Sequence, residues 1–373
     1  MIEIISSNTF HNLSLATDGL ISNNPFFDLK FFLALEDSKS IGKGTGWISF
    51  PILAKENDLI VGFMPIFLKE HSYGEYVFDW SWAEAFHQHG LKYYPKMLCA
   101  IPFTPITGPR FYARDKEVKR MLIRALEKFL EQHSISSCHI LFPNQQDHQI
   151  LKEMGWLSRH GVQFKWHNKN YNHFDDFLMT LSHDKRKKIK QERKKIKRSN
   201  VEIIQKVGET ITNEDISFFY QCYCNTYQEH NSTPYLTIDF FFQLLTVMPE
   251  KLLLIEAEID GRLIASAFNV IGLDTLYGRY WGALIYIPGL HFELCYYQGQ
   301  EFCIENKLEY FEGGAQGEHK LARGFEPFTT YSNHYIVNSD FRGAIKNFLD
   351  EESEKMHEYS HDLDDRKPYK KSL

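Results

Sequence analysis

The chain has 373 residues, of which 43% are hydrophobic and 15% aromatic, and its formal net charge is −6. This length exceeds the size at which one hydrophobic core usually stops growing, so two domains are expected, and the composition excludes a largely disordered chain. The acidic balance excludes a protein whose overall field attracts nucleic acid. Positive charge is instead concentrated locally, because ten of the fourteen residues from Lys185 to Arg198 are Lys or Arg and only Glu192 is acidic.

The sequence lacks the signals typical of a secreted protein, a membrane-spanning protein or a metal-binding protein. The start, MIEIISSNTF, has no positive region followed by an apolar run, and no stretch approaches the roughly 20 apolar residues that span a bilayer. The six cysteines contain no CxxC pair, and no acid or cysteine is arranged around His87 and His89. We therefore expect a cytoplasmic protein with no transmembrane segment, no metal site and no tightly bound cofactor.

The first half predicts an alternation of helices and strands. Pro25 suits the first turn of a helix over residues 24–37, and strands follow through residues 47–80, with a hairpin turn at Lys55–Asp58. Apolar residues at helical spacing predict an amphipathic helix over Lys116–His133. The remaining elements of this half are a buried strand from residue 137, a short helix over 150–156 and a strand over 162–168.

The second half repeats this order. Asp260-Gly261 predicts the turn of a hairpin over residues 251–272. The other predicted helices cover residues 174–199, 213–226, 239–247, 289–307 and about 342–357, and the other strands cover 201–207, 274–283 and 308–314. Because each half gives a helix, a meander of strands, a helix and a strand, the sequence predicts two related α/β domains joined near residues 165–175.

Six segments carry a more specific signal. They are TGWISFP (45–51), HSYGEYVFDWSWA (71–83), YYPKMLCAIPFTPITGPR (93–110), LYGRYWGA (276–283), LHFELCYYQGQEFCI (290–304) and FEGGAQGEHKLARGFEP (311–327). Together they resemble a bacterial family of predicted N-acyltransferases that is similar to the FemAB-like enzymes, which add amino acids to peptidoglycan precursors. The order of elements from residue 251 to 314 also resembles the core of the GNAT acyltransferase fold.

The resemblance implies a fold and a class of reaction. The fold would be mixed α/β, with tandem GNAT-like acyl-CoA N-acyltransferase domains at residues 1–168 and 169–334, and residues 335–373 would form a C-terminal helix and tail that pack on the first domain. The reaction would transfer an acyl or aminoacyl group to an amine, with a cell-wall precursor as a candidate acceptor. Acyl-CoA and aminoacyl-tRNA are both candidate donors, because GALIYIPGLHFE (282–293) lacks the usual glycine spacing of a coenzyme A loop.

The segment 311–327 places four glycines among charged side chains, where a GNAT-like fold opens between its central strands. Glu312 is predicted to orient the amine, and His319 to accept or relay its proton. The loop's predicted substrate-binding residues are Gly313, Gly314, Gln316, Lys320 and Arg323, with the glycines admitting substrate to the backbone and the two cations holding phosphate. A polar turn with a helix cap is the alternative interpretation.

The strand LYGRYWGA and the helix after it supply the other candidates. Strict alternation would place Tyr277, Arg279 and Trp281 on one face, and Gly278, Tyr280 and Gly282 on the other. The predicted substrate-binding residues here are Arg279, Tyr280 and Trp281. Arg279 is expected either to bind a substrate carboxylate or phosphate or to pair with an acid such as Glu293. His291 is the third catalytic candidate.

The basic segment 185–198 has two apolar residues, Ile189 and Ile196, which are seven apart and share one face. A solvated helix is one interpretation, and a surface for tRNA, a diphosphate lipid or an anionic membrane is the other. The aromatic segment 71–90 is expected to pack in a core, with stacking on a sugar or lipid as its alternative. Two competing functions remain: a non-catalytic binding protein of the same fold, and an RNA- or membrane-surface protein acting through the basic helix.

Overall fold

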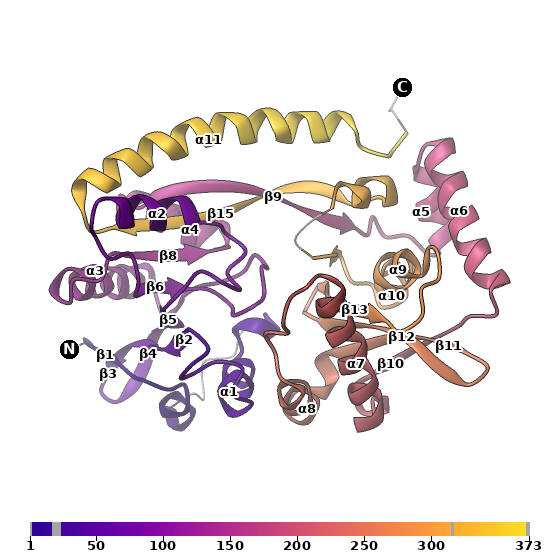
Figure 1. Cartoon of the computed structure of the whole chain (residues 1–373), viewed down its shortest axis with the longest axis horizontal. Helices are drawn as coiled ribbons and strands as arrows, with labels where there is room; N and C mark the ends of the chain where they lie inside the picture. The colour runs from indigo at the N-terminus through magenta and orange to yellow at the C-terminus, as the bar shows by residue number, and fades with distance from the viewer. Residues whose placement is uncertain (1, 17–23, 315–316, 371–373) are drawn as a thin grey trace. The chain divides into compact units, whose positions relative to one another are not determined.

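The computed structural model describes residues 2–16, 24–314 and 317–370, and these fall into two compact units (Figure 1). Unit 1 comprises residues 1–162 and 329–359, and unit 2 comprises residues 163–328 and 360–373. The division therefore falls within three elements, namely β9 (Leu157–His167), β15 (Glu326–Ile336) and α11 (Ser339–Asp365). The domain boundaries at residues 168 and 334 stay a prediction from the sequence.

Unit 1 contains strands in two groups. One group has the order β1-β3-β4-β7, formed by β1 (Ile2–Ser6), β3 (Ile52–Glu56), β4 (Leu59–Met64) and β7 (Tyr112–Ala113). The other has the order β15-β8-β6-β5-β2, formed by β15, β8 (Ser137–Leu141), β6 (Lys96–Cys99), β5 (Ile66–Lys69) and β2 (Trp47–Ser49). The helices of this unit are α1 (Leu29–Asp37), α2 (Trp80–Gln88), α3 (Lys116–Gln132) and α4 (Gln145–Glu153), with most of α11.

The amphipathic helix and the hairpin predicted for this unit are confirmed. Asp115 caps α3 by accepting a hydrogen bond from the Val118 amide, and the apolar face of the helix packs on β3 and β4 in a buried core. The hairpin turns at Asn57 and Asp58, whose positive φ angles of 50° and 66° suit a tight turn.

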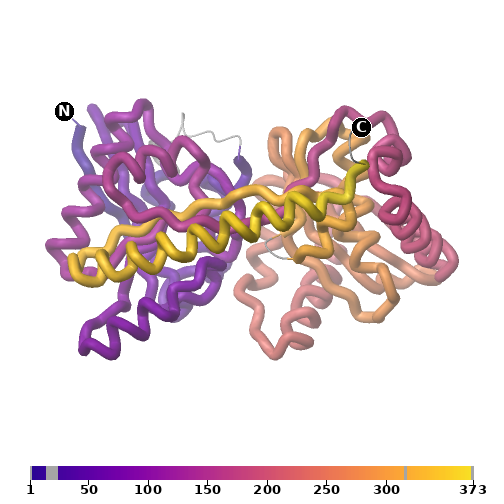
Figure 2. Tube along the Cα trace, turned by 90° about the horizontal axis from the view of Figure 1, so that it is seen from above, coloured from indigo at the N-terminus to yellow at the C-terminus, as the bar shows by residue number. Residues whose placement is uncertain are grey.

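The aromatic segment 71–90 differs from its prediction. No strand follows β5 until β6, and residues 70–79 form a loop that leads into α2. Trp82 and Phe86 of α2 do join a core with the first part of α11, which runs alongside β15 (Figure 2). The other rings point outward and are 37–59% exposed, namely Tyr73, Tyr76, Phe78 and Trp80. They do so because the polar residues between them turn inward, where Ser72, Glu75 and Asp79 bind the buried Lys96.

Unit 2 is built on a sheet with the order β10-β11-β12-β13-β14-β9, where β10 is Glu202–Val207, β11 is Leu252–Ile259, β12 is Arg262–Ile271, β13 is Thr275–Ala283 and β14 is Tyr310–Glu312. Its helices are α5 (Phe174–Thr180), α6 (His183–Arg198), α7 (Asn213–Glu229), α8 (Ile238–Val247), α9 (Leu290–Phe292) and α10 (Gln298–Glu305). A π-helical turn (Glu293–Tyr297) joins α9 to α10. Helices α7 and α8 cover one face of the sheet and α10 the other (Figure 1).

Several predicted elements have different limits in the structure. The helix predicted over 174–199 is broken between α5 and α6, where Leu181 forms a bridge with Tyr369. Helix α11 is longer than the predicted 342–357, and the described chain after it is held by hydrogen bonds. The Tyr369 hydroxyl donates to the Gly324 carbonyl at 2.6 Å, and the Ser182 amide donates to the Pro368 carbonyl at 2.9 Å. The last described residues therefore lie beside α5 and α6 (Figure 2).

We expect Gly282→Ala to destabilise the protein, because a Cβ there would lie 1.9 Å from the Cys222 carbonyl oxygen and would push α7 off β13. Overpacking of this kind costs about 1–3 kcal/mol. The control is Gly343→Ala in α11, where a Cβ meets no atom within 4 Å and should be neutral or stabilise by about 0.5–1 kcal/mol. Chemical unfolding of both variants tests this, and an unchanged midpoint for Gly282→Ala would contradict the packing described.

Candidate functional site

The sheet of unit 2 opens between two parallel strands. β13 and β14 pair over only three residues each, from Thr275–Tyr277 on one strand to Tyr310–Glu312 on the other. β14 ends at Glu312, whereas β13 continues to Ala283. The edge of β13 that faces β14 thus continues past the end of its partner. We call this place the β13–β14 opening and define it by residues 278–283 and 312–314.

A β-bulge shapes β13 at the opening. The pairing of Phe268 with Tyr280 and of Asn269 with Gly278 leaves Arg279 as an additional residue. The predicted alternation is therefore wrong here, because an extra residue shifts the phase. A Cβ at Gly278 would meet the Phe311 ring, which also lies against α10, whereas Tyr280 packs on Tyr223 of α7 with ring centroids 5.2 Å apart. The half-buried Tyr280, a predicted substrate-binding residue, thus packs on the helices of that face.

Glu312 lies at the end of β14, where the opening begins, and is 8% exposed. One carboxylate oxygen is 3.9 Å from the Lys165 amino group, and the other accepts no hydrogen bond from the described residues. Burial raises the pKa of this carboxyl to about 7, although Lys165 and Arg279 act in the opposite direction. Glu312 can therefore gain or lose a proton near neutral pH.

Gly313 and Gly314 meet different requirements at the end of β14. Gly314 has a φ of +85°, a left-handed conformation that favours glycine, while a Cβ on it would make only ordinary contact, 3.8 Å from the Gly278 carbonyl oxygen. Gly313 serves packing, because a Cβ there would lie 3.0 Å from the Phe325 ring. Gln316, a predicted substrate-binding residue, lies outside the described residues.

The structure brings both histidine candidates into one aromatic cluster. The Nε2 of His319 is 2.8 Å from the Tyr296 hydroxyl, and its ring centroid is 6.2 Å from that of His291. Trp281 packs on His291 with ring centroids 4.7 Å apart. Gly317 makes room for this arrangement, because a Cβ there would lie 2.3 Å from the His319 ring.

The three catalytic candidates differ in the pKa of their side chains. Burial, with the neighbouring His319, Arg323 and Lys320, lowers the pKa of His291 to about 4. Burial and the same two cations also lower the pKa of His319. Because the pKa of Glu312 is about 7, its carboxylate binds a proton about a thousandfold more tightly than His291 does. Glu312 is the better candidate for a general base.

Lys320 and Arg323 are turned into the protein. Lys320 is 1% exposed, and its amino group donates to the Gly314 carbonyl at 2.7 Å. Burial lowers its pKa to about 8. Arg323 is 3% exposed and donates to Glu192 and to the His319 carbonyl, each at 2.9 Å. These contacts favour a role in fixing the loop over the predicted direct grip on phosphate.

Glu293, considered above as a partner for Arg279, binds a different cation. Together with Glu301 it holds Arg193 of α6, at distances of 3.0 Å and 2.7 Å respectively. This pairing ties α6 to the π-helical turn.

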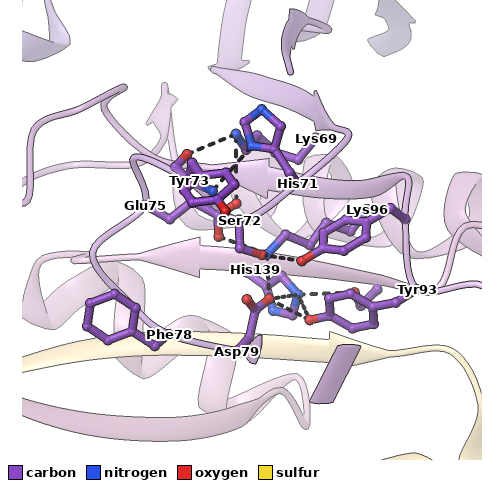
Figure 3. A network of polar contacts seen from close by, with 12 residues as sticks. Lys69, His71, Ser72, Tyr73, Glu75, Phe78, Asp79, Tyr93, Lys96 and His139 are labelled. Carbon is purple, nitrogen blue, oxygen red and sulfur yellow. Dashed lines mark hydrogen bonds and ion pairs between the residues drawn. The ribbon is translucent and has the colours of Figure 1, made fainter. Parts of the chain in front are cut away.

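Unit 1 contains a buried ionic network that sequence reasoning missed (Figure 3). The amino group of Lys96 donates to Ser72 at 2.7 Å and to Glu75 at 2.8 Å, and it also binds Asp79. Lys69 lies 3.9 Å from Glu75 and donates to the Tyr73 carbonyl at 3.3 Å. The one signal in the sequence was a lysine at the start of an apolar strand, KMLC.

The ionisable groups of this network differ in their pKa values, and so in how stable their charges are near neutral pH. Burial lowers the pKa of Lys69 to about 7 and raises that of Glu75 to about 7. Burial also disfavours the charged form of Asp79, but Lys96 outweighs this effect and lowers the pKa of Asp79 to about 2. Lys96 and Asp79 therefore form a permanent ion pair, while Lys69 and Glu75 titrate near neutral pH.

A hydrogen-bonded chain extends the network across three strands. The Tyr93 hydroxyl donates to Asp79 at 2.6 Å and lies 3.0 Å from His139 on β8. His139 in turn lies 2.7 Å from His334 on β15, measured between their Nδ1 atoms. Burial lowers the pKa of His139 to about 3 and lowers that of His334 as well. Both imidazoles are neutral at pH 7, so the chain satisfies buried polar groups without adding charge.

Comparison with known proteins decides the family. The sequence profile of the FemAB-like family, described as peptidoglycan biosynthesis/recognition, matches residues 1–371. The chain belongs to the FemAB-like family. A comparison with curated protein sequences finds no match.

This FemAB-like protein is similar to several solved structures at low sequence identity, and the first two named here share its fold. FemX is 13% identical, with a TM-score of 0.54 over 92% of this chain and 100% of that chain. L-PGS from Bacillus licheniformis is 10% identical, with a TM-score of 0.51 over 83% of this chain and 91% of that chain. A tandem GNAT protein from the clavulanic acid biosynthesis pathway is 9% identical, with a TM-score of 0.45 over 91% and 99%.

The predicted fold class, mixed α/β with GNAT-like domains, is confirmed. The family supports an acyl- or aminoacyl-transferase role in peptidoglycan synthesis. Among the described helices, none combines the length and the apolar character that crossing a bilayer requires.

We expect Lys96→Met in this FemAB-like protein to lower the free energy of unfolding by about 3–5 kcal/mol at pH 7–8, because it leaves buried carboxylates without their cation. Without Lys96, burial raises the folded-state pKa of Glu75 and Asp79 above the unfolded values. The stability they contribute is then present at low pH and lost as pH rises, so the defect should shrink toward pH 5. The control is the exposed Lys92→Met. Chemical unfolding at pH 5 and 8 tests this, and equal stability of both variants would contradict it.

Proposed function

We propose that this protein is an N-acyltransferase that moves an acyl or aminoacyl group from an activated donor to an amine of a peptidoglycan precursor. The observation that carries the proposal is Glu312, a buried carboxyl with a pKa raised to about 7 that lies where β13 and β14 part. The FemAB-like family supplies the chemical class and the acceptor class.

The chemistry requires a base before anything else. An amine is mostly protonated at neutral pH, and it must lose a proton before its lone pair can attack a carbonyl carbon. The Glu312 carboxylate takes that proton. The new C–N bond pushes the carbonyl electron pair onto oxygen, and the nitrogen, now positively charged, loses a second proton. The tetrahedral intermediate then collapses, and the sulfur or oxygen of the donor takes up a proton and leaves as a thiol or hydroxyl. The exposed His319, hydrogen-bonded to Tyr296, is the candidate to relay the proton to water.

The opening supplies positioning for this reaction. At the edge of β13 beyond β14, the Trp281 and Ala283 carbonyls already accept hydrogen bonds from Thr226 and Asn225 of α7, so an extended donor would pair with the other backbone groups of this edge. Arg279 at the bulge and Trp281 beyond it belong to the same edge. Lys320 keeps most of its charge at pH 7 and holds the Gly314 carbonyl, so the end of the loop has a fixed place. Acyl-CoA and aminoacyl-tRNA both fit this chemistry as donors.

A second element of the proposal is an RNA-binding face on α6. Ile189 and Ile196 are 1% and 3% exposed, so α6 turns both of its apolar residues inward. A shallow hollow of about 300 Å³ on its outer side is lined by His183, Arg186, Lys187, Lys190, Gln191 and Lys194. A helix that inserts into a bilayer needs an outward apolar face, which α6 lacks. The exposed charges can contact a phosphodiester backbone, and we propose the aminoacyl-tRNA donor as their ligand.

We expect the rate of transfer to rise with pH through about 7, because Glu312 must be deprotonated to accept the amine's proton. Glu312→Gln should lower kcat/KM by about 10²–10⁴-fold and remove this pH dependence. The control is Glu309→Gln, an exposed acid three residues earlier. The assay follows thiol release from an acyl-CoA series and transfer of labelled amino acids from charged tRNA to peptidoglycan precursors. A Glu312→Gln enzyme with wild-type rates would contradict the role of Glu312, and donor binding without turnover would favour the non-catalytic alternative.

We expect the triple variant Lys187→Gln, Lys190→Gln, Lys194→Gln to weaken RNA binding and to make binding less sensitive to salt. Each phosphate that the variant no longer neutralises should reduce the slope of log K against log salt by roughly 0.7–0.9. Removing three exposed cations from α3 instead (Lys116, Arg124 and Lys128) is the control. Filter binding with tRNA tests this over a salt series. Equal weakening by both triple variants would assign the effect to net charge, and binding to anionic vesicles in place of tRNA would favour the membrane alternative.

A further inference from the structure

The basic helix contains one acid between residues 185 and 198, and that acid does not face solvent with the lysines. Glu192 has a side chain only 17% exposed. Its carboxylate accepts two hydrogen bonds from one nitrogen of Arg323, at 2.9 Å and 3.1 Å, and a third from the Tyr297 hydroxyl. A carboxylate with this many donors is held in one place.

Arg323 connects Glu192 to the loop that carries His319. Its other terminal nitrogen donates to the His319 carbonyl at 2.9 Å, and its guanidinium lies 3.4 Å from the centroid of the Phe292 ring. The contacts run from Glu192 on α6, through Arg323, to the backbone of His319. Residues 318–323 form a short 3₁₀ helix, so fixing Arg323 fixes the turn that carries His319.

The residue after Glu192 is a cation, Arg193, and it also holds α6 in place. Arg193 binds Glu293 and Glu301, which lie on the π-helical turn and on α10. Two consecutive residues, Glu192 and Arg193, thus attach α6 to the helix that carries Tyr296, the hydrogen-bond partner of the His319 ring. The backbone of His319 is therefore connected to α6 through Arg323, and its ring is connected to α6 through the helix that carries Tyr296.

We infer that Glu192 is a positioning residue, whose carboxylate holds Arg323 and through it sets the place and the electrostatic surroundings of His319. The effect of this positioning on acyl transfer rests on the proposed function. The positioning itself does not, because it follows from contacts within unit 2. Together with Arg193, Glu192 therefore makes the basic helix part of the scaffold of the site.

The groups that face His319 define how its titration should respond. They are His291 and Tyr296 from the helix beyond β13, and Lys320 and Arg323 from its own turn, while the adjacent Glu318 pairs with Arg366 at 2.6 Å. Of these, Arg323 is the cation that Glu192 compensates. Removing the carboxylate leaves that cation uncompensated, and removing the guanidinium takes the cation away. The two changes should shift the pKa of His319 in opposite directions.

The test is an NMR titration of the His319 imidazole in the full chain, with His319→Gln to assign its signal. Glu192→Gln keeps the shape of the side chain and should lower the pKa of His319 by about 0.3–1, whereas Arg323→Gln should raise it by a similar amount. Asp175→Asn is the matched control, because Asp175 also pairs with α6, through Lys190 at 3.1 Å, but lies on the exposed side. It should leave His319 unchanged.

The outcomes separate this inference from the proposed function, because the titration needs no donor and no turnover. Opposite shifts in Glu192→Gln and Arg323→Gln support the positioning role even where the wild-type protein transfers nothing. Thermal unfolding identifies any variant that loses its fold, and for such a variant Glu192→Ala and Arg323→Met replace the glutamine changes, with shifts of the same sign expected. An unchanged His319 in folded variants, or an equal shift in Asp175→Asn, would overturn the inference.

Discussion

The site depends on one feature of the sheet of unit 2, which is that β14 stops pairing with β13 at Glu312 while β13 continues. The end of the pairing leaves a carboxyl at the inner end of an opening, with little solvent exposure and one oxygen that accepts no hydrogen bond from the described residues. The bulge at Arg279 bends β13 between the part that pairs with β14 and the part that continues beyond it. Burial, with a smaller contribution from Asp274, then raises the proton affinity of Glu312.

The buried network of unit 1 and Glu312 of unit 2 differ in how their charge is compensated. In unit 1, Lys96 sits among Ser72, Glu75 and Asp79, so each buried charge there has an opposite partner at hydrogen-bonding distance or just beyond it. Such a network is typical of a rigid support, because losing one member leaves the others uncompensated. In unit 2, Glu312 has its nearest cation at 3.9 Å. A buried acid with so little compensation is costly for stability, and it is the arrangement expected where proton transfer is needed.

The sequence predicted the classes of elements well and their tertiary roles poorly. The hairpin at Asp260-Gly261 and the helix from Lys116 follow from local turn chemistry and periodicity, and both are present. The bulge at Arg279 has no local signal, because it depends on the register of β12 against β13. The inward turn of Lys320 and Arg323 was also hidden, since their partners lie at Gly314 and at the distant Glu192. Glu312 could be proposed from the sequence because a carboxylate before two glycines at a strand end is visible in the chain itself.

The most direct test is a measurement on Glu312 alone. A ¹³C NMR titration of its carboxyl carbon in the wild-type protein, assigned with Glu312→Gln, reports the proton affinity on which the proposed base chemistry depends. The structure predicts a midpoint of about 7. A midpoint at the ordinary value for glutamate, about 4.3, would show that the carboxyl is solvated and would contradict the account.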